Sequence, residues 1–316
     1  MRLPELRIGQ LVAKVPIIQG GMAVRLSTAR LAAAVAEQGG IGLIAASGMT
    51  FDELRQEIRL ARSLTKGIIG INIMVAARQF ANIVKTAIDE GIDLIVPGAG
   101  FSRDVFALGK ASGTPIVPIS SWVKGAKIAE TLGAAAVIVE GKEAGGHLGT
   151  DQPMSTILPK IKAAVKIPVI AAGGIITGKD IAEAIKLGAD GVQMGTRFAA
   201  SEESNAAPAL KEFYLKAKPE DVVHIQSPVG LPGQAIKNPF AAKIIEGTVE
   251  PPVSCDACLK HCSRNFCIIK ALIRAQQGDI ENGLVFTGEY IHKIDEILSV
   301  KEIFTRLLRE VEDIQI

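Results

Sequence analysis

Short apolar runs alternate with helical patterns along the first two hundred or so residues, and this alternation constrains the fold more than any other feature. Eight runs of the strand type can be counted, and they occupy 15–22, 41–47, 67–75, 92–100, 114–121, 134–147, 167–175 and 190–198. Between them lie segments with apolar residues at helical spacing, such as FDELRQEIRLARSL over 51–64. A period that switches back and forth in this way indicates βαβ units and a parallel sheet.

Eight parallel strands alternating with helices favour an α/β fold of the (β/α)8 TIM-barrel type. An open, doubly wound sheet is the alternative that the same pattern allows. The composition fits a parallel sheet, because 48% of the 316 residues are hydrophobic while only 4% are aromatic. The core must therefore consist mostly of Ala, Val, Ile and Leu, as in buried strands flanked by Ala-rich helices.

After residue 200 the regular alternation of strand-type runs and helical segments ends. SEESNAAPALKEFYLKA indicates a helix, and the stretch that follows is mixed and punctuated by Pro and Gly. We expect a smaller, mostly helical elaboration over about 201–265, which lies over the barrel like a lid and ends in a cysteine cluster. Residues 1–200 and about 266–316 would then form the barrel, with the last helices closing it.

Charge and hydropathy exclude several classes of function. The net charge is +2, and the basic residues are scattered among acids, so the sequence has neither a nucleic-acid footprint nor a polybasic membrane patch. The N-terminus MRLPELRIGQ lacks an apolar signal core, and no apolar stretch reaches eighteen residues without a charge or a turn. We expect a cytoplasmic protein that acts on a small molecule, without nucleic acid or membrane as a partner.

Most of the predicted strands end in polar or glycine-rich residues, and in a barrel all these ends converge on the face where active sites lie. EGKEAGGHLG, over 140–149, follows the sixth strand, and its glycines let a ligand approach the backbone closely. His147 can face that ligand. Glu140 stands at the strand end itself, where a charge is costly unless it finds a partner.

Two further glycine motifs follow the seventh and eighth strands, AAGGI over 171–175 and QMGTRF over 193–198. Loops at these places commonly bind phosphate through backbone N–H groups and a helix N-terminus. The Thr196 hydroxyl adds a possible donor. The alternative is that the glycines only make tight βα turns.

His147 is the one histidine at a predicted strand end. An imidazole titrates near neutrality and can take or give a proton at physiological pH. A structural histidine bonded to nearby backbone is the alternative. His224, His261 and His292 lack this context, and we assign them surface or local structural roles.

QGGM after the first strand, EGKEAGGHLG after the sixth, AAGGI after the seventh and QMGTRF with the following ASEES resemble the nitronate monooxygenase family. This family is often labelled 2-nitropropane dioxygenase-like, and it includes the flavin-dependent enoyl-acyl-carrier-protein reductases of type II. The resemblance runs in order over about the first 205 residues, and EAGGH is its most specific part. More weakly, 278–297 resembles the C-terminal region of the family.

The resemblance implies flavin mononucleotide (FMN) at the barrel mouth and His147 as the catalytic residue. It places the FMN phosphate at Gly173, Gly174, Gly195 and Thr196. It places the isoalloxazine ring against Gly21, Met22 and Asn72, with Gln193 nearby and the segment from Glu143 to Gly146 along one side. Flavin barrels are often dimers, so a homodimer is an expectation by analogy only.

Three activities remain open. The leading one is oxidation of alkyl nitronates by O2 through the flavin, as in a nitronate monooxygenase. The second is reduction of enoyl thioesters, such as an enoyl-acyl-carrier protein, with electrons from NAD(P)H or from an electron carrier. The third is a phosphate-ligand barrel enzyme without redox chemistry, such as an isomerase or aldolase.

The chain's four cysteines, Cys255, Cys258, Cys262 and Cys267, have the spacing C-x2-C-x3-C-x4-C, which members of the family do not generally carry. A C-x2-C-x3-C run is similar to the iron–sulfur segment of the bacterial dienoyl-CoA reductases, although there the fourth cysteine lies farther away. Four thiolates suit a [4Fe–4S] cluster or a structural Zn2+, and His261 is a possible substitute ligand. Reduced thiols without metal, or one oxidised pair, are the alternatives. A cluster near the flavin would favour a reductase that is fed by an electron carrier.

Overall fold

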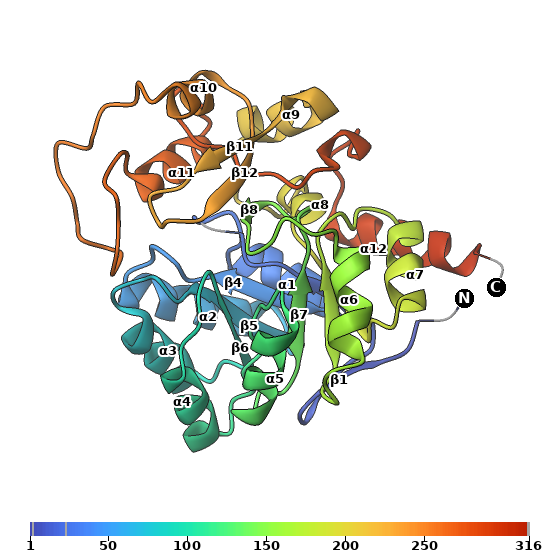
Figure 1. Ribbon diagram of the computed structural model, residues 1–316. Helices are drawn as coiled ribbons and strands as arrows, with labels where there is room; N and C mark the ends of the chain where they lie inside the picture. Colours follow the sequence, from blue (N-terminus) through green and yellow to red (C-terminus); the bar gives the residue numbers. More distant parts are fainter. Residues whose placement is uncertain (2, 23, 315–316) are drawn as a thin grey trace.

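A computed structural model describes residues 1, 3–22 and 24–314. Seven parallel strands form one curled sheet in the order β6-β5-β4-β3-β10-β9-β7 (Figure 1). Their bounds are β3 (Ile17–Gln19), β4 (Ile41–Ala45), β5 (Ile68–Met74), β6 (Leu94–Gly98), β7 (Val137–Glu140), β9 (Val169–Ala172) and β10 (Gly191–Met194). All seven lie within the runs that the sequence marks as strands.

The eighth predicted run, around 116–119, closes the ring without forming a regular strand. Ile116 makes an isolated parallel bridge to Ile95 of β6, and Ile119 makes another to Ile138 of β7. Pro115 and Pro118 lack the N–H that a ladder needs, so the pairing is interrupted there. Because the segment joins the two edges of the sheet, the structure confirms the (β/α)8-type barrel and rules out the open sheet.

Seven helices connect the strands on the outside of the barrel. They are α1 (Ala29–Glu37), α2 (Phe51–Leu64), α3 (Phe80–Asp89), α4 (Asp104–Ser112), α5 (Val123–Thr131), α6 (Met154–Lys162) and α7 (Gly178–Lys186). Helix α2 illustrates why they form where they do. Thr50 and Glu53 make a reciprocal capping box, and Leu54, Ile58 and Ala61 place a buried stripe on one face.

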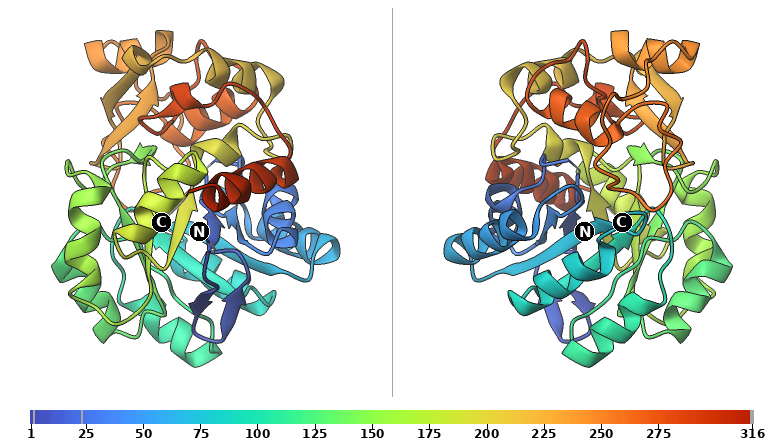
Figure 2. Two further views of the ribbon diagram at one scale, coloured as in Figure 1. Left: turned by 90° about the vertical axis from the view of Figure 1, so that its right-hand side faces the viewer. Right: turned by 90° about the vertical axis from the view of Figure 1, so that its left-hand side faces the viewer.

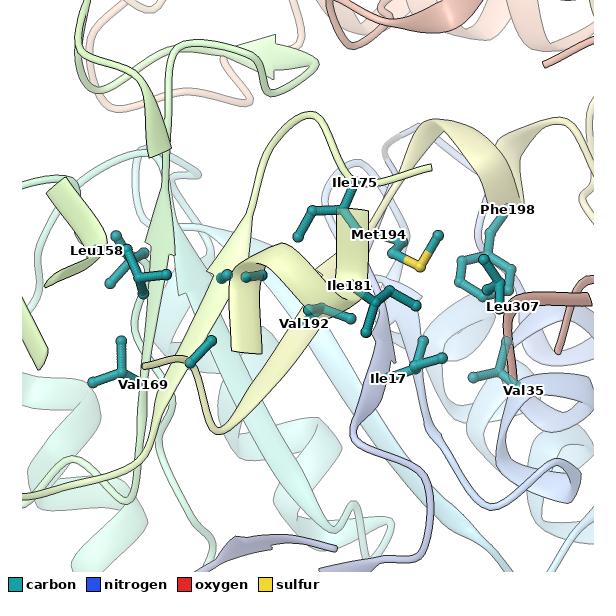
Figure 3. Close-up of a cluster of buried hydrophobic side chains, with 14 of the residues drawn as sticks. Ile17, Val35, Leu158, Val169, Ile175, Ile181, Val192, Met194, Phe198 and Leu307 are labelled. Atoms are coloured by element: carbon teal, nitrogen blue, oxygen red, sulfur yellow. The ribbon is translucent and has the colours of Figure 1, made fainter. Parts of the chain in front are cut away.

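The eighth helical position is filled from the far end of the sequence by α12 (Val300–Glu312), which packs beside α7 and α1. Figure 3 shows Leu307 of α12 among Val35 of α1, Ile17 of β3 and Phe198. Every one of these side chains is buried. Of the last helices, α12 therefore packs on the barrel.

The barrel interior has its own apolar core, made of side chains that point inward from successive strands. This core includes Ile18, Leu43, Leu94, Val96, Val117, Ile138 and Ile170. The hairpin of β1 (Leu6–Ile8) and β2 (Leu11–Ala13) adds Leu6, Ile8 and Ala13 to the same cluster. It lies at the lower end of the barrel in Figure 1, so only the opposite end of the barrel is left for a site.

Residues 201–299, which we call the cap, cover the carboxyl ends of the strands (Figures 1 and 2). The elements between β10 and α12 are α8 (Thr196–Ala199), α9 (Pro208–Lys216), η1 (Pro219–Asp221), β11 (Val222–Gln226), β12 (Pro232–Ile236), α10 (Pro239–Glu246), α11 (Ile268–Gln276) and η2 (Ile291–Lys293). Strand β12 pairs with β11 and with β8 (Gly146–His147), a short strand in the loop after β7.

Helix α11 belongs to the same hydrophobic cluster as α10 and β11, although it lies beyond residue 265. The division of the chain into folding units near 200 and 265 therefore stays a prediction. Within the described residues, no helix combines the length and the apolar character needed to cross a membrane.

Candidate active site

One cavity lies between the strand ends and the cap. The residues that the sequence analysis assigned to catalysis or to the cofactor all line it, namely Gly21, Met22, Asn72, Glu143, Gly146, His147, Gly173, Gly174, Gln193, Gly195 and Thr196. The cap contributes a further wall, which includes Tyr214, Ile268, Ile269, Leu272, Phe286, Thr287 and Tyr290. The four cysteines lie elsewhere.

His147 is positioned by the cap, although it comes from a barrel loop. Its strand, β8, pairs with β12, with His147 opposite Gly233. The imidazole Nε2 lies 2.7 Å from Oγ of Ser227, and the ring packs edge-on against Phe286 with centroids 5.3 Å apart. Burial lowers the pKa of His147 to about 4. The ring is therefore neutral at physiological pH, with one N–H to donate and one nitrogen to accept.

Glu140, at the end of β7, lines the same cavity. Burial raises the pKa of its carboxyl to about 8. No ion pair to Glu140 occurs within the part of the chain that the structure describes. The cost of a charge at this strand end is thus avoided by keeping the proton, and the cavity holds a neutral acid beside a neutral imidazole.

Gly21 and Asn72 form a closely packed part of the cavity floor. A Cβ on Gly21 would lie 2.1 Å from Cβ of Asn72, so only glycine allows the two strand ends to approach this closely. The Asn72 side chain is fixed by its Nδ2, which donates to the carbonyl oxygen of Val96 at 3.0 Å. Packing against Gly21 and this hydrogen bond thus fix the Asn72 side chain without the help of a ligand.

Gln193 of β10 is the residue that best fits a cofactor in this cavity. Its side chain is buried and lines the cavity, yet its Oε1 has no hydrogen-bond partner among the described residues. Leaving a buried acceptor unpaired costs about 1–3 kcal/mol, which a ligand N–H would recover. A flavin ring carries such a group, so the residue fits the cofactor that the family resemblance implies.

The two glycine motifs after β9 and β10 fit a phosphate. Gly173 and Gly174 have φ of +101° and +73°, the left-handed region that favours glycine. A Cβ on Gly195 would have nothing nearer than Met22 at 3.9 Å, so the backbone there borders open space. Oγ1 of Thr196 accepts from the Gly288 N–H at 2.9 Å, which leaves its own O–H proton free to donate.

Two residues of the EAGGH segment have structural duties that the sequence did not indicate. The Glu143 carboxylate accepts from the Met154 N–H at 3.0 Å and so caps the start of α6. A Cβ on Gly145 would lie 2.6 Å from the carbonyl carbon of Thr287, so this glycine admits the cap backbone. Contact of Glu143 with a cofactor stays a prediction.

Sequence reasoning missed Ser227, Phe286, Thr287 and Tyr290, all of which lie in the cap. The weak resemblance over 278–297 pointed to the segment that holds three of them, but it singled out no side chain. Ser227 has no local signal, because only the pairing of β8 with β12 brings it to His147.

The cysteines lie in the connection between α10 and α11, which runs down one side of the molecule in orange in Figure 1. All four are free thiols, and Cys255 and Cys258 are exposed. Burial, and then the charges of Cys267, Cys255 and Cys262, raise the pKa of Cys258. The described residues hold no group of three or more His, Cys, Asp or Glu side chains that could hold a single metal ion.

The fold and the cavity define a (β/α)8-barrel with glycine motifs, an imidazole and an acid around a cavity at its mouth. Residues 5–90 and 76–310 match the family model described as nitronate monooxygenase. The chain therefore belongs to the nitronate monooxygenase family of flavin-dependent oxidoreductases, as its motifs predicted. Membership of this family implies FMN as the cofactor.

Known relatives carry more than one activity. A (3aS,4S,5R,7aS)-5-hydroxy-7a-methyl-1-oxo-octahydro-1H-indene-4-carboxyl-CoA dehydrogenase of Rhodococcus jostii is 35% identical over 70% of this chain and 62% of that protein, so the chain spans less than two thirds of its length. A probable nitronate monooxygenase of Staphylococcus aureus strain Newman is 32% identical over 71% of this chain and 76% of that protein.

Two solved structures resemble this one over nearly all of the chain. FabK from Thermotoga maritima is 38% identical and has a TM-score of 0.87, covering 95% of this chain and 93% of that one. Nitroalkane oxidase from Streptomyces ansochromogenes is 26% identical and has a TM-score of 0.80, covering 95% of this chain and 96% of that one.

Proposed function

We propose that the protein binds FMN at the barrel mouth and reduces the carbon–carbon double bond of an enoyl thioester. The observation that carries this proposal is the apolar wall above the glycine-lined floor. Ile268, Ile269 and Leu272 of α11 face the cavity together with Leu26 and Ile176 from the barrel. Such a wall suits an acyl chain, whose burial contributes about 0.8 kcal/mol for each CH2.

The FMN would be held by the residues that the motifs and the cavity bring together. Backbone N–H groups at Gly173, Gly174 and Gly195 and the Thr196 hydroxyl would bind the phosphate, and Gln193 Oε1 would accept from the ring. When bound, FMN supplies the hydride for the β-carbon of the substrate and is recharged by NAD(P)H or an electron carrier.

His147 and Glu140 would supply the other two groups that the reduction requires, which are a hydrogen-bond donor for the carbonyl oxygen and a proton donor for the α-carbon. The neutral imidazole can donate its N–H to the thioester carbonyl oxygen, where negative charge develops, and Ser227 holds the ring in place. The protonated carboxyl of Glu140 can deliver the proton that the α-carbon requires. Both groups border the same cavity as the floor on which the ring would lie.

The relatives support this order of preference. FabK, named an enoyl-acyl-carrier-protein reductase, is the more similar of the two solved structures in both identity and TM-score. The Rhodococcus relative is named as a dehydrogenase of a CoA thioester, which is chemistry on the same class of substrate.

Oxidation of nitronates, the leading expectation from the sequence, becomes the second candidate. It is favoured by the neutral state of His147, because an imidazole without its second proton can act as a base toward a nitroalkane. The Staphylococcus and Streptomyces relatives carry names of this chemistry. The non-redox alternative is set aside, because the family is one of flavin-dependent oxidoreductases.

An anaerobic absorbance titration separates the two candidates. The flavin-loaded protein is mixed first with NADH, then with NADPH, and the reduced protein is then given a short enoyl-CoA. Prompt bleaching by a nicotinamide, followed by recovery on adding the enoyl thioester, is the expected result. Flavin that stays oxidised until a nitronate is added would establish the second candidate, and protein that cannot take up flavin would exclude both.

A further inference from the structure

The proposed function assigns no role to the connection between α10 and α11, which covers residues 247–267. It carries every cysteine of the chain within thirteen residues, from Cys255 to Cys267. Three of these cysteines, Cys255, Cys258 and Cys262, line a surface hollow of their own, separate from the active-site cavity. Cys267 stands at the end of the same connection, directly before the first residue of α11.

This connection is hydrogen-bonded to the barrel at residues 258–260, between two of the cysteines. Ala77 and Leu259 form an antiparallel bridge, flanked by hydrogen bonds from the Arg78 N–H to the Cys258 carbonyl and from the Lys260 N–H to the Ala76 carbonyl, both 2.9 Å long. The Lys260 ammonium donates to the Val75 carbonyl at 2.9 Å and lies 5.4 Å from the centre of the Phe80 ring. These contacts hold the backbone of the connection in place next to Cys258 and Cys262.

The charge around the hollow favours an anionic guest. Arg78, Lys260, His261 and Arg264 line it, whereas its described lining includes no Asp or Glu. Neither Arg78 nor Arg264 makes an ion pair with any described residue. A metal centre held by four thiolates carries net negative charge, which these cations would offset.

The two metal centres that the spacing permits make different demands on the four thiols. A structural Zn2+ requires four ligands about 2.0–2.3 Å from one point. The described side chains include no group of three or more metal-ligating residues that could hold a single ion. Cys255, Cys258 and Cys262 instead line one hollow, with Cys267 at the end of the same connection, and this favours a group larger than one ion.

We propose that Cys255, Cys258, Cys262 and Cys267 bind a [4Fe–4S] cluster in this hollow. The cluster would lie against the wall of the active-site cavity, because Ile268 and Ile269, which follow Cys267 directly, line that cavity. On the barrel side, Val75 and Ala76 hold the connection and follow Met74, which lines the cavity as well. A centre at this place exchanges single electrons with a one-electron donor.

The test uses the full chain, purified without oxygen and reconstituted with iron and sulfide. We expect about four iron atoms and four acid-labile sulfides per chain, and an electron paramagnetic resonance signal after reduction by dithionite. Cys258→Ala and Cys262→Ala should each lose more than about three quarters of the iron, since every cluster corner requires its thiolate. Ser263→Ala is the matched control, because Ser263 lies in the same connection and uses only its backbone N–H, toward Pro228.

A thiol titration of the unaltered protein keeps the test independent of how the variants fold. With a cluster bound, fewer than four thiols should react until acid or a chelator releases the iron, and four should react afterwards. One zinc per chain, iron that the cysteine variants retain, or four reactive thiols after reconstitution would each overturn the proposal. None of these outcomes depends on the substrate, so the proposal stands or falls apart from the enoyl-thioester assignment.

Discussion

The floor and the cap of the active-site cavity are built in different ways. The floor consists of strand ends that the barrel brings together, with glycines at several of them and polar side chains at others, such as Asn72 on β5 and Gln193 on β10. The cap reaches the same cavity through long-range pairing, as where β12 aligns with β8 and brings Ser227 to His147. The floor thus comes from successive strand ends, while the cap sets the surroundings of His147.

This difference matters for function because the relatives of this chain are named for different activities. FabK and nitroalkane oxidase share the fold of this chain, and the CoA dehydrogenase and the probable nitronate monooxygenase resemble it in sequence. The residues that could distinguish them, such as Ile268 and Phe286, come from the cap. Specificity is therefore to be sought above the floor.

Replacement of His147 should have the largest effect, because this residue belongs to both regions. His147→Ala should lower turnover by about two orders of magnitude or more, since it removes the imidazole from the cavity. Flavin should remain bound, because the phosphate and ring contacts lie on the floor. Turnover and flavin content are measured on the same sample, and unchanged turnover would remove His147 from the mechanism.

Asn238 offers a way to loosen the cap alone. Its Oδ1 caps α10 by accepting from the Ala241 N–H, and its Nδ2 donates to the carbonyls of Ile280 and Gly283. Asn238→Ala should lower the free energy of unfolding by about 2–3 kcal/mol, because a cap and two buried bonds are lost. Asn238→Asp keeps the helix cap but turns a second oxygen toward the carbonyl oxygens of Ile280 and Gly283, so it should not recover the loss.

Hydrogen exchange on the Asn238 variants then tests whether the two regions are distinct. Amides of α11 and β12 should exchange faster in Asn238→Ala, while those of β4 and β5 keep their protection. Equal loss of protection in all four elements would mean that cap and barrel unfold as one unit.

Glu140 should make the rate of enoyl reduction depend on pH near 8, whereas His147, with a pKa of about 4, should not. Because burial raises the pKa of Glu140 to about 8, the carboxyl keeps its proton below that pH and loses it above. The rate of enoyl reduction by pre-reduced protein should therefore fall as pH rises through about 8. Glu140→Gln should be about tenfold slower at neutral pH and lack this fall. A fall that persists in the variant would assign it to another group.

Ser227 should have the smallest effect of the four residues, because it acts through His147. Ser227→Ala removes the hydroxyl 2.7 Å from Nε2. A neutral hydrogen bond contributes about 1 kcal/mol, so kcat should fall about fivefold with flavin content unchanged. Ser227→Thr, which keeps a hydroxyl, should recover most of the loss, and equal rates for the Ala and Thr variants would argue against the hydrogen bond.

The floor could be predicted because local periodicity reveals the strands on whose ends its residues lie, and because the family resemblance singles out residues such as Gly21 and Asn72. His147, Gly173 and Gln193 all belong to the βα repeat, and their convergence follows from closing a barrel. The irregular strand around 116–119 was predicted for the same reason, although its prolines break the ladder.

The sequence could not predict the contacts that depend on pairing between distant segments. Ser227 lies 80 residues from His147, and nothing in its neighbourhood indicates a partner. Gly145 appeared to serve a ligand, but it is required by the close approach of Thr287. The sequence likewise did not indicate that Glu143 caps the start of α6, because the helix amide that it binds lies eleven residues away.

The position of α12 has a consequence for how the chain is made. The eighth helical position of the barrel is supplied only after the cap has been synthesised, and at about 5–20 residues per second the intervening hundred or so residues take roughly 5–20 s. During that time the surfaces of α1 and α7 that α12 will cover, including Val35 and Ile181, face solvent on the nascent chain. Chaperones that recognise exposed apolar surface have that interval in which to bind, so a ribosome stalled within the cap would present an aggregation-prone, unfinished barrel.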